Sequence, residues 1–345
     1  MNARRTTLHA VLLLATVVAP FLFPDFRIQL AALWLMIIVA LTRDMTGGQM
    51  GYNSLGNIFF YGAGMYVAAL VAIGLVYNVG DYTSASGGGV KDFTASQYFT
   101  GMLLGTLAAG VFSAISAVLI GYVTFGLRGP YFAIGTLGVA IAAGELVSNW
   151  DWVGGGQGVS LPVYPYDFEQ GKLFFYFLFA GMGVGLFVFL KWLYSTRFGA
   201  AINAIRDDEE KAEAMGIHTM RYKLTSWSIS AFFVGMAGAV SGFQLIQFEP
   251  LETAFQTINL GIFMVVCVLL GGKGTLWGPV IGAVLFHVIK EVTWNYFLGW
   301  QWVALGALIV VTVVYFQDGI MGWLRLRRPD WFGIRVDAGS GEAAR

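Results

Sequence analysis

The chain has 345 residues, of which 57% are hydrophobic and 12% charged, and its mean hydropathy is +0.69. Soluble domains carry about 25% charged residues, so much of this surface must face lipid rather than water. A formal net charge of zero gives no basic field for nucleic acid, and the single cysteine, Cys267, excludes a disulfide framework and a multi-cysteine metal site.

A membrane helix needs about 20 mostly apolar residues. The pattern predicts an all-α, polytopic membrane helix bundle with about ten transmembrane helices. The expected spans are residues 8–23, 28–42, 53–79, 98–124, 130–149, 173–194, 223–246, 257–270, 276–298 and 301–317. The first is read as a retained helix, because no small-residue cleavage site follows it. The third is too long for one straight crossing, so we expect it to be tilted, broken or re-entrant.

Lysine and arginine set the orientation of such a bundle, because they accumulate in cytoplasmic segments. With both termini inside, the outer segments hold only Arg27, Lys91 and Lys172. The cytoplasmic segments then hold Arg4, Arg5, Arg43, Arg128, Arg197, Arg206, Lys211, Arg221, Lys223, Lys273, Arg325, Arg327, Arg328, Arg335 and Arg345. We therefore expect cytoplasmic N- and C-termini, with residues 1–325 forming one transmembrane domain and residues 326–345 a disordered tail.

Polar residues cluster at the start of the third span. Asn53, Ser54 and Asn57 lie near a helix start, where free backbone N–H groups can meet a carboxylate, and Tyr61 and Tyr66 supply aromatic walls. These five residues are candidates for a substrate pathway. Ordinary helix capping by Asn53 or Ser54 is the alternative.

Ionisable residues also fall inside predicted spans. A charge at the bilayer centre costs at least about 2.5 kcal/mol, so it needs a partner. Glu145 and Lys290 are placed at similar depth by the helical rise, which predicts an ion pair between them and a further pathway role for Glu145. A static strut or a lysine reaching toward the headgroups is the alternative.

Two outer loops carry exposed polar residues. Gln157, Glu249 and Glu252 are candidates for docking a soluble partner, since docking surfaces carry exposed charge; plain solubility is the alternative.

The longest polar loop, residues 195–222, is predicted to contain a short helix. Asp207 or Asp208 can cap its start and Gly216 can end it. A helix that offers Ala214 and Met215 is suited to a groove in another protein. A solvated surface helix is the alternative.

The turn Gly271–Thr275 has a superficial likeness to a phosphate-binding loop. Its lysine, Lys273, is followed by glycine, and its flanks are predicted membrane helices, so the nucleotide-loop pattern is not met. We expect a tight corner between two spans.

Ala200–Gly216 resembles the coupling loop of ATP-binding cassette (ABC) importer permeases. Further blocks resemble the LivM-type branched-chain amino acid permease family over about residues 40–325: Leu127–Gly138, Asn149–Val159, Arg221–Ala239 and Leu270–Ala283. This resemblance implies a type II ABC importer permease fold and contact between the loop and an ATPase subunit. The implied coupling residues are Arg206, Asp207, Asp208, Glu209, Glu213, Ala214, Met215 and Gly216.

The resemblance further implies an inner-membrane subunit that pairs with a LivH-like permease, two ABC ATPase subunits and a periplasmic substrate-binding protein. ATP hydrolysis would belong to the ATPase partners. The chain itself shows no catalytic constellation, and we expect no cofactor and no metal.

The sequence departs from the family pattern at Ile141, Gly144, Asn57 and Val153–Gly158. These differences leave the substrate open between branched-chain or related small amino acids, urea, short amides and aromatic acids. An ion-coupled secondary transporter is the rival of another class, since embedded charges could form its relay. A membrane scaffold without transport is a third reading.

Overall fold

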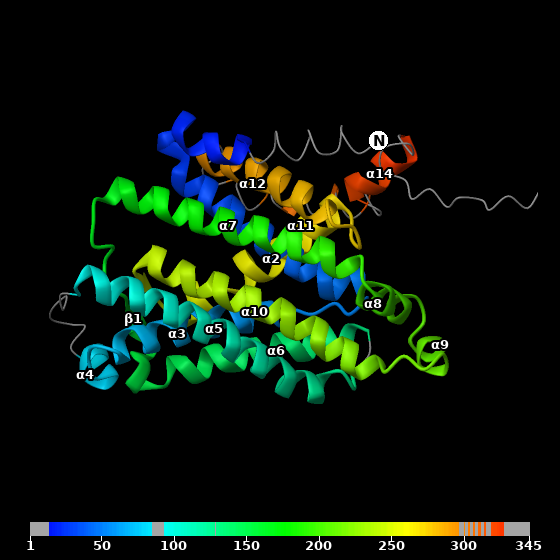
Figure 1. Cartoon of the computed structure of the whole chain (residues 1–345), viewed down its shortest axis with the longest axis horizontal. Helices are drawn as coiled ribbons and strands as arrows, with labels where there is room; N and C mark the ends of the chain where they lie inside the picture. Colours follow the sequence, from blue (N-terminus) through cyan, green and yellow to red (C-terminus); the bar gives the residue numbers. More distant parts are fainter. Residues whose placement is uncertain are drawn as a thin grey trace, which may run out of the picture.

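The computed structural model describes residues 14–84, 93–127, 129–296 and 319–327, with isolated positions between 300 and 314. It is a bundle of long helices running side by side (Figure 1). The helices are α2 (Arg27–Asp44), α3 (Asn57–Gly74), α5 (Ala95–Thr124), α6 (Pro130–Ser148), α7 (Phe168–Tyr194), α10 (Thr219–Leu245), α11 (Phe263–Gly271), α12 (Gly278–Tyr296) and α14 (Gly319–Arg327).

Shorter elements join these helices. They are η1 (Pro24–Phe26), η2 (Met45–Gln49), α4 (Val79–Ser84), η4 (Asp151–Val153), η5 (Gly155–Gln157), β1 (Val159–Ser160), α8 (Arg197–Asp207), α9 (Glu209–Ala214), β2 (Gln247–Phe248), η6 (Pro250–Ala254) and η7 (Thr257–Ile262). The two strands pair antiparallel, with Val159 opposite Phe248.

Six helical stretches among the described residues are long and apolar enough to cross a membrane. They are Pro24–Gln49, Asn57–Gly74, Ala95–Thr124, Pro130–Ser148, Phe168–Tyr194 and Thr219–Leu245. Leu260–Gly271 is a shorter apolar helix. The all-α polytopic prediction is confirmed. The count of ten spans stays a prediction, because residues 1–13 and most of residues 301–318 lie outside the described residues.

The long third span is shorter in the structure than the sequence indicates. Helix α3 begins only at Asn57 and ends at Gly74. Before it, α2 continues through the π-helical turn η2 into residues 50–56, which form no regular helix. We call residues 45–56 the polar break. The break is the physical reason that one apolar stretch does not form one straight crossing.

Helices α3, α5 and α10 pack against one another in one half of the bundle, and α2 packs on α7, α11 and α12 in the other. Helices α3 and α10 approach each other closely at a pair of glycines, Gly64 and Gly235. A Cβ added to Gly64 would lie 2.2 Å from the backbone oxygen of Gly235. Only glycine at this point allows the two backbones to approach so closely.

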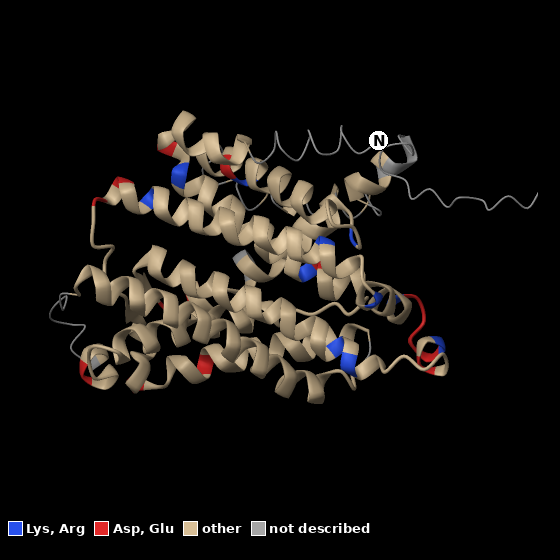
Figure 2. Cartoon of the chain, in the orientation of Figure 1, with Lys and Arg blue, Asp and Glu red and all other residues tan. Residues whose placement is uncertain are grey.

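Lysine and arginine residues gather at the end of the bundle that carries α8 and α9, where they are mixed with the acidic residues around α9 (Figure 2). Helices α8 and α9 project from one end, where Arg206, Lys211 and Lys223 lie. The opposite end carries α4 and β1, and the acidic residues Asp81, Glu249 and Glu252 belong to its loops and short elements. We call them the α9 end and the β1 end. The predicted tail beyond Arg327 lies outside the described residues.

Candidate functional site: the loop 195–222 and the polar break

The loop 195–222 folds into two helices rather than the one that its charge pattern predicts. Helix α8 starts after Thr196, whose side chain accepts a hydrogen bond from the Phe198 N–H at 3.2 Å. Its Ile202 and Ile205 are buried against the bundle. This apolar face anchors the loop to the membrane helices and holds α9 out beyond them.

Helix α9 has the start and the end that the sequence predicts. The Asp208 carboxylate accepts a hydrogen bond from the Lys211 N–H at 3.0 Å, which caps the helix. The Lys211 ammonium lies 2.9 Å from the same carboxylate. Hydrogen bonding from Lys211 therefore holds the pKa of Asp208 below its ordinary value. Gly216 ends the helix at φ +86°, a left-handed conformation that suits glycine.

The tip of α9 is exposed. Met215 retains 83% of its accessible surface, and Ala214 and Gly216 beside it are exposed as well. A Met side chain held in solvent by a capped helix is unusual for a chain with no partner, because Met is flexible and apolar. The small-residue surface predicted for this loop is thus present and accessible.

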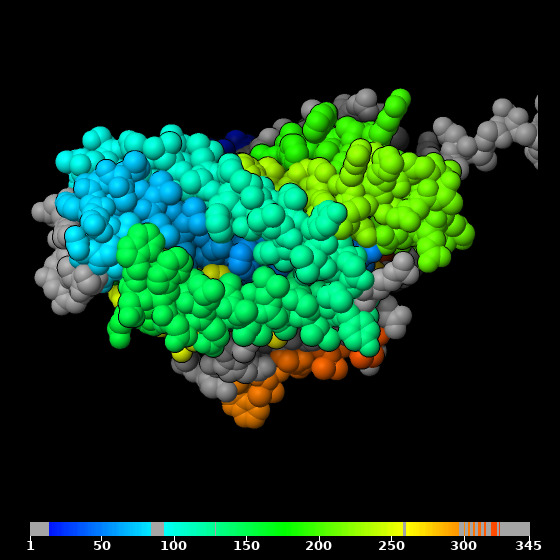
Figure 3. Space-filling view, turned by 90° about the horizontal axis from the view of Figure 1, so that it is seen from below, coloured from blue at the N-terminus to red at the C-terminus, as the bar shows by residue number. Residues whose placement is uncertain are grey.

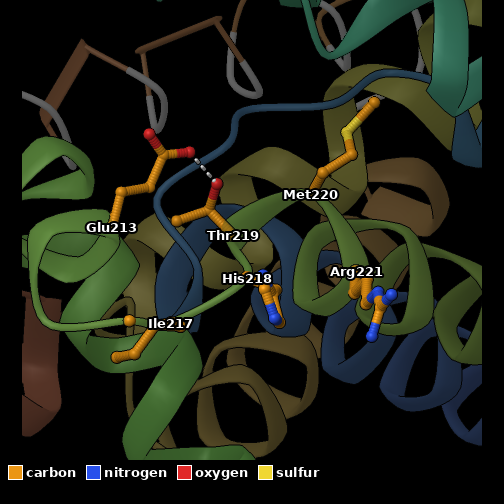
Figure 4. Close-up of a pocket in the computed structure, with 7 residues that line it drawn as sticks. Glu213, Ile217, His218, Thr219, Met220 and Arg221 are labelled. Carbon is orange, nitrogen blue, oxygen red and sulfur yellow. Dashed lines mark hydrogen bonds between the residues drawn. The ribbon is translucent and has the colours of Figure 1, made fainter.

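A surface hollow of about 420 Å³ lies beside this tip (Figure 4). Its walls are Glu213, Gly216, Ile217, His218, Thr219, Met220 and Arg221. Glu213 accepts a hydrogen bond from the Thr219 hydroxyl at 2.5 Å, which joins the end of α9 to the start of α10. The hollow combines apolar side chains with the cationic Arg221, so it can receive a side chain from another protein.

The start of α9 is tied to the bundle by a partly buried ion pair. The Lys223 ammonium, on α10, donates to Glu209 at 2.6 Å and to the Tyr52 hydroxyl at 3.2 Å. Tyr52 also donates a hydrogen bond to the other oxygen of Glu209. Lys223 lies 4.9 Å from the centre of the Tyr52 ring, a cation–π contact. Tyr52 belongs to the polar break, so α9, α10 and the break meet here.

Arg206, at the end of α8, makes a second contact with the polar break. A Cβ added to Gly51 would lie 3.0 Å from the Arg206 Cγ, and Gly51 has φ +84°. A Cβ added to Gly274 would lie 3.3 Å from an Arg206 guanidinium nitrogen. The turn Gly271–Thr275 therefore lies at the α9 end, and it forms the tight corner that we expect: the Thr275 hydroxyl donates to the Gly272 carbonyl at 3.0 Å.

Of the three polar residues predicted at the start of the third span, one is exposed and two are buried. Asn53 is exposed and accepts a hydrogen bond from Arg43 at 3.3 Å. Ser54 and Asn57 are fully buried. The Ser54 hydroxyl accepts from the Gly56 N–H at 3.0 Å, within the turn before α3. The N-cap of α3 is Gly56, and no side chain caps this helix start, so the capping alternative for Asn53 or Ser54 is wrong.

Asn57 lies between α2 and α10. Its side-chain amide is 3.5 Å from the Thr42 hydroxyl, and Ser230 of α10 donates to the Thr42 carbonyl at 3.0 Å. Its side-chain oxygen is buried without a hydrogen-bond partner. A buried amide with an unused acceptor is expensive to maintain in a helix bundle. This arrangement keeps Asn57 a candidate for a polar role in the pathway.

Tyr61 and Tyr66 are both buried along α3, with 6% and 4% of their surface exposed. Tyr66 makes an edge-on contact with Phe248 at 5.2 Å and stacks on Phe255 at 6.2 Å. These two tyrosines form part of the interior packing between α3 and the segment that follows α10.

Glu145 lies on the exposed face of α6, which runs across one surface of the molecule (Figure 3). The buried face of α6 is Phe132, Thr136, Ala140 and Gly144, spaced every four residues. Helix α6 is the least covered of the six candidate spans, with 22% of its apolar window buried. A carboxylate on so open a helix requires a polar surrounding outside this chain.

The predicted ion pair between Glu145 and Lys290 is not made within the described residues. The ion pairs there are Arg27–Glu169, Lys172–Glu169, Arg206–Asp207, Lys211–Asp208 and Lys223–Glu209. Lys290 lies on α12, which packs on α11 and α2, and its ammonium is 5.9 Å from the ring centres of Phe263 and Trp294. Glu145 and Lys290 were expected at similar depth in the membrane, but α6 and α12 do not turn the two side chains toward each other.

The candidate docking residues share one end of the molecule. Gln157 ends η5, and Glu249 and Glu252 lie at and within η6; all three side chains are exposed. The segments η5 and η6 contact each other, next to the β1–β2 pair. The β1 end therefore presents these polar groups together.

Sequence reasoning missed the roles of Tyr52 and Lys223. In the sequence Lys223 is one of several basic residues predicted on the cytoplasmic side, and Tyr52 is a residue just before the third predicted span. Their contact joins positions 171 residues apart, and no local pattern indicates it.

The described residues thus form a helix bundle with six candidate membrane spans and a capped, exposed loop helix at the α9 end. Residues 28–314 match the family model for the permease component of the branched-chain amino acid transport system. The chain belongs to this permease family and is a multi-pass inner-membrane protein. The expected LivM-type resemblance is confirmed.

The relatives are consistent with this assignment. The high-affinity branched-chain amino acid transport system permease protein LivM of Escherichia coli is 27% identical over 96% of this chain and 78% of its own length. A probable LivM of Methanocaldococcus jannaschii is 22% identical over 85% of this chain and 93% of its own length. A probable LivH of the same archaeon is 27% identical over 42% of this chain. No solved structure matches the chain.

Proposed function

We propose that the chain moves branched-chain or related small amino acids from periplasm to cytoplasm by alternating access, driven by ATP hydrolysis in separate subunits. The observation that carries this proposal is the exposed tip of α9, Ala214 and Met215, held out by the buried face of α8. An autonomous carrier has no need of such a tip. The proposed cytoplasmic side is the α9 end, with both termini on it.

In this proposal the tip and the hollow beside it form the ATPase-binding surface. The coupling residues are Arg206, Asp207, Asp208, Glu209, Glu213, Ala214, Met215 and Gly216. Met215 inserts into a groove of the ATPase, as amphipathic helices do in helix-in-groove recognition. A LivH-like permease, two ABC ATPase subunits and a periplasmic binding protein complete the assembly. Gln157, Glu249 and Glu252 at the β1 end receive the binding protein.

The transport pathway is proposed to run past the polar break and the open face of α6. Asn53, Ser54 and Asn57, with Tyr61 and Tyr66, form its inner boundary, and Glu145 its outer one. The second permease would cover α6 and provide the polar surrounding that the Glu145 carboxylate requires.

Reconstitution in proteoliposomes tests the proposal. The chain is assembled with the LivH-like permease, the two ATPases and the binding protein, and uptake of labelled leucine is measured with and without ATP. Uptake that requires ATP supports the proposal. Uptake that continues without ATP and collapses with a protonophore overturns it in favour of an ion-coupled carrier.

Two further measurements define the surface and the substrate. Met215→Asp is expected to abolish ATPase binding, whereas Met215→Leu, which keeps an apolar side chain, is expected to preserve it. Competition of leucine uptake by urea, a short amide and an aromatic acid then identifies the substrate class. Displacement by one of these compounds and not by valine would replace the branched-chain assignment.

A further inference from the structure

The loop 195–222 and the polar break are joined at two points. Arg206 of α8 lies against Gly51, and Glu209 of α9 is hydrogen-bonded to Tyr52. These contact points are adjacent in the break and three residues apart in the loop. Any displacement of α9 therefore acts directly on the segment that leads into α3.

The second contact is built to resist stretching. The Lys223 side chain is 6% exposed and that of Glu209 24% exposed, so water screens their attraction only weakly. Lys223 is fixed in turn by the rings of Tyr52 and Phe125, at 4.9 and 5.5 Å. Two oxygens of Glu209 are engaged by two different donors, which fixes the direction of the carboxylate as well as its position.

The far side of this contact is equally firm. The Tyr52 ring packs edge-on against Phe125 and Phe132, each at 5.4 Å between centres. Two residues beyond Tyr52 is the buried Ser54, and the Leu55 N–H donates to Thr136 of α6 at 3.0 Å. The segment from Tyr52 to α3 is therefore held by Phe125 at the end of α5 and by Phe132 and Thr136 of α6. These contacts restrict its movement relative to both helices.

We propose that Tyr52, Glu209 and Lys223 form a strut that passes movement of α9 to the polar break, and that these three positioning residues couple ATP hydrolysis to opening of the pathway. The inference rests on the proposed function, because it requires an ATPase that moves α9. It adds a route inside this chain, from the loop 195–222 through Tyr52 to Ser54 and Asn57.

The test separates coupling from folding and assembly. Glu209→Gln combined with Lys223→Met removes both charges at once, so no lone charge is left buried. The control is Lys172→Met, which removes the lysine of another pair, Lys172–Glu169, also 2.6 Å long but at the opposite end of α7 from α8, and leaves Glu169 its second partner, Arg27. Each variant is purified with its partner subunits in proteoliposomes, and three quantities are measured: assembly yield, basal ATPase rate, and ATPase stimulation by leucine-loaded binding protein.

The strut predicts that the double variant still assembles, because the tip residues Ala214 and Met215 are unchanged. Its ratio of stimulated to basal ATPase rate, and its uptake, are expected to fall at least tenfold. The Lys172→Met control is expected to keep all three quantities. Lys223→Arg with Glu209 intact is expected to keep most of the stimulation, because a cation still faces the Glu209 carboxylate.

Two results overturn the strut. Stimulation equal to wild type in the double variant shows that the pair carries no coupling. Loss of assembly in the double variant, with the control intact, shows that the pair only supports the docking surface. Failure of the proposed function gives a different result in the wild-type protein. Either leucine-loaded binding protein then fails to stimulate its ATPase, or uptake proceeds in the absence of ATP.

Discussion

Two lysine–glutamate pairs of identical length lie at different places in this bundle, and their surroundings make them different interactions. Lys223–Glu209 and Lys172–Glu169 both measure 2.6 Å, and each lysine also lies within 5 Å of an aromatic ring centre. The first joins α9 to α10 and is nearly enclosed. The second joins neighbouring turns of α7 and its glutamate is 53% exposed.

The difference shows that the length of an ion pair does not measure its importance. An exposed pair within one helix is screened by water and salt and positions nothing beyond its own helix. A pair between elements, shielded from water, fixes their relative position and cannot lose one partner without leaving a charge behind. The largest effects of mutation are therefore expected at Lys223.

Lys223→Met alone is expected to destabilise the protein by about 3 kcal/mol, because it leaves Glu209 partly buried without its cationic partner. Thermal unfolding of the detergent-solubilised chain measures the loss as a lower Tm. Adding Glu209→Gln to this variant is expected to return most of the Tm, since no lone charge then remains. A Tm for Lys223→Met equal to that of wild type would show that water stabilises the Glu209 carboxylate as well as Lys223 does.

Tyr52→Phe is expected to cost about 1 kcal/mol, the usual net value of one hydrogen bond. The ring contacts with Phe125 and Phe132 are kept, so only the hydroxyl that bridges Lys223 and Glu209 is lost. The same unfolding experiment applies. A loss as large as that of Lys223→Met would contradict the assignment of the ion pair as the main contribution.

Asp208→Ala acts only on α9 and is expected to reduce its amide protection about fivefold, since an N-cap side chain is lost, without changing the Tm of the bundle. Hydrogen exchange of residues 209–214 measures this effect. The pH dependence has a definite sign. Because Lys211 holds the pKa of Asp208 below its ordinary value of about 3.9, the carboxylate cap is fully present above that value.

The cap is then lost as the pH falls through the lowered pKa of the folded state. Wild-type protection of α9, corrected for the intrinsic exchange rate, is expected to stay constant from pH 7 to about pH 5. In Asp208→Ala no carboxylate titrates at this position, so its smaller protection is unchanged by acid below pH 4. Loss of wild-type protection already at pH 6 would show that another group controls α9.

Lys172→Met has the smallest expected effect, a Tm within about 1 °C of wild type, because the pair that it removes is exposed and local and Glu169 keeps its contact with Arg27. Raising the salt concentration is expected to weaken this pair in wild type and to leave Lys223–Glu209 nearly unaffected. A large Tm decrease for Lys172→Met would remove the contrast between the two pairs.

Much of this architecture follows from local sequence. Apolar stretches of about 20 residues give the long helices directly, and Asp208 and Gly216 mark the two ends of α9, because capping depends on neighbours in the chain. The start of α3 at Asn57 does not follow from hydropathy, which places the start of the third span at residue 53, inside the polar break. The burial of Ser54 and Asn57 depends on α2 and α10, which pack there from elsewhere in the chain.

The predicted pairing of Glu145 with Lys290 is wrong because the sequence gives the depth of a residue along a helix but not the direction of its side chain. Depth can be counted from the start of the helix, and it is similar for these two residues. The direction of a side chain around the helix axis depends on tertiary packing. Gly144 is on the buried face of α6 and Glu145, one residue later, is on the open one. Tyr52 and Lys223 were overlooked because only the folded chain brings them together.

The glycine contact between α3 and α10 restricts how the bundle can change shape. With the backbones of Gly64 and Gly235 touching and no side chain between them, neither helix can rotate or slide past the other without a collision. The two therefore behave as a single stiff beam. Spin labels placed on α3 and α10 are expected to keep one distance throughout the transport cycle, so they provide a fixed reference against which the motion of every other helix can be measured.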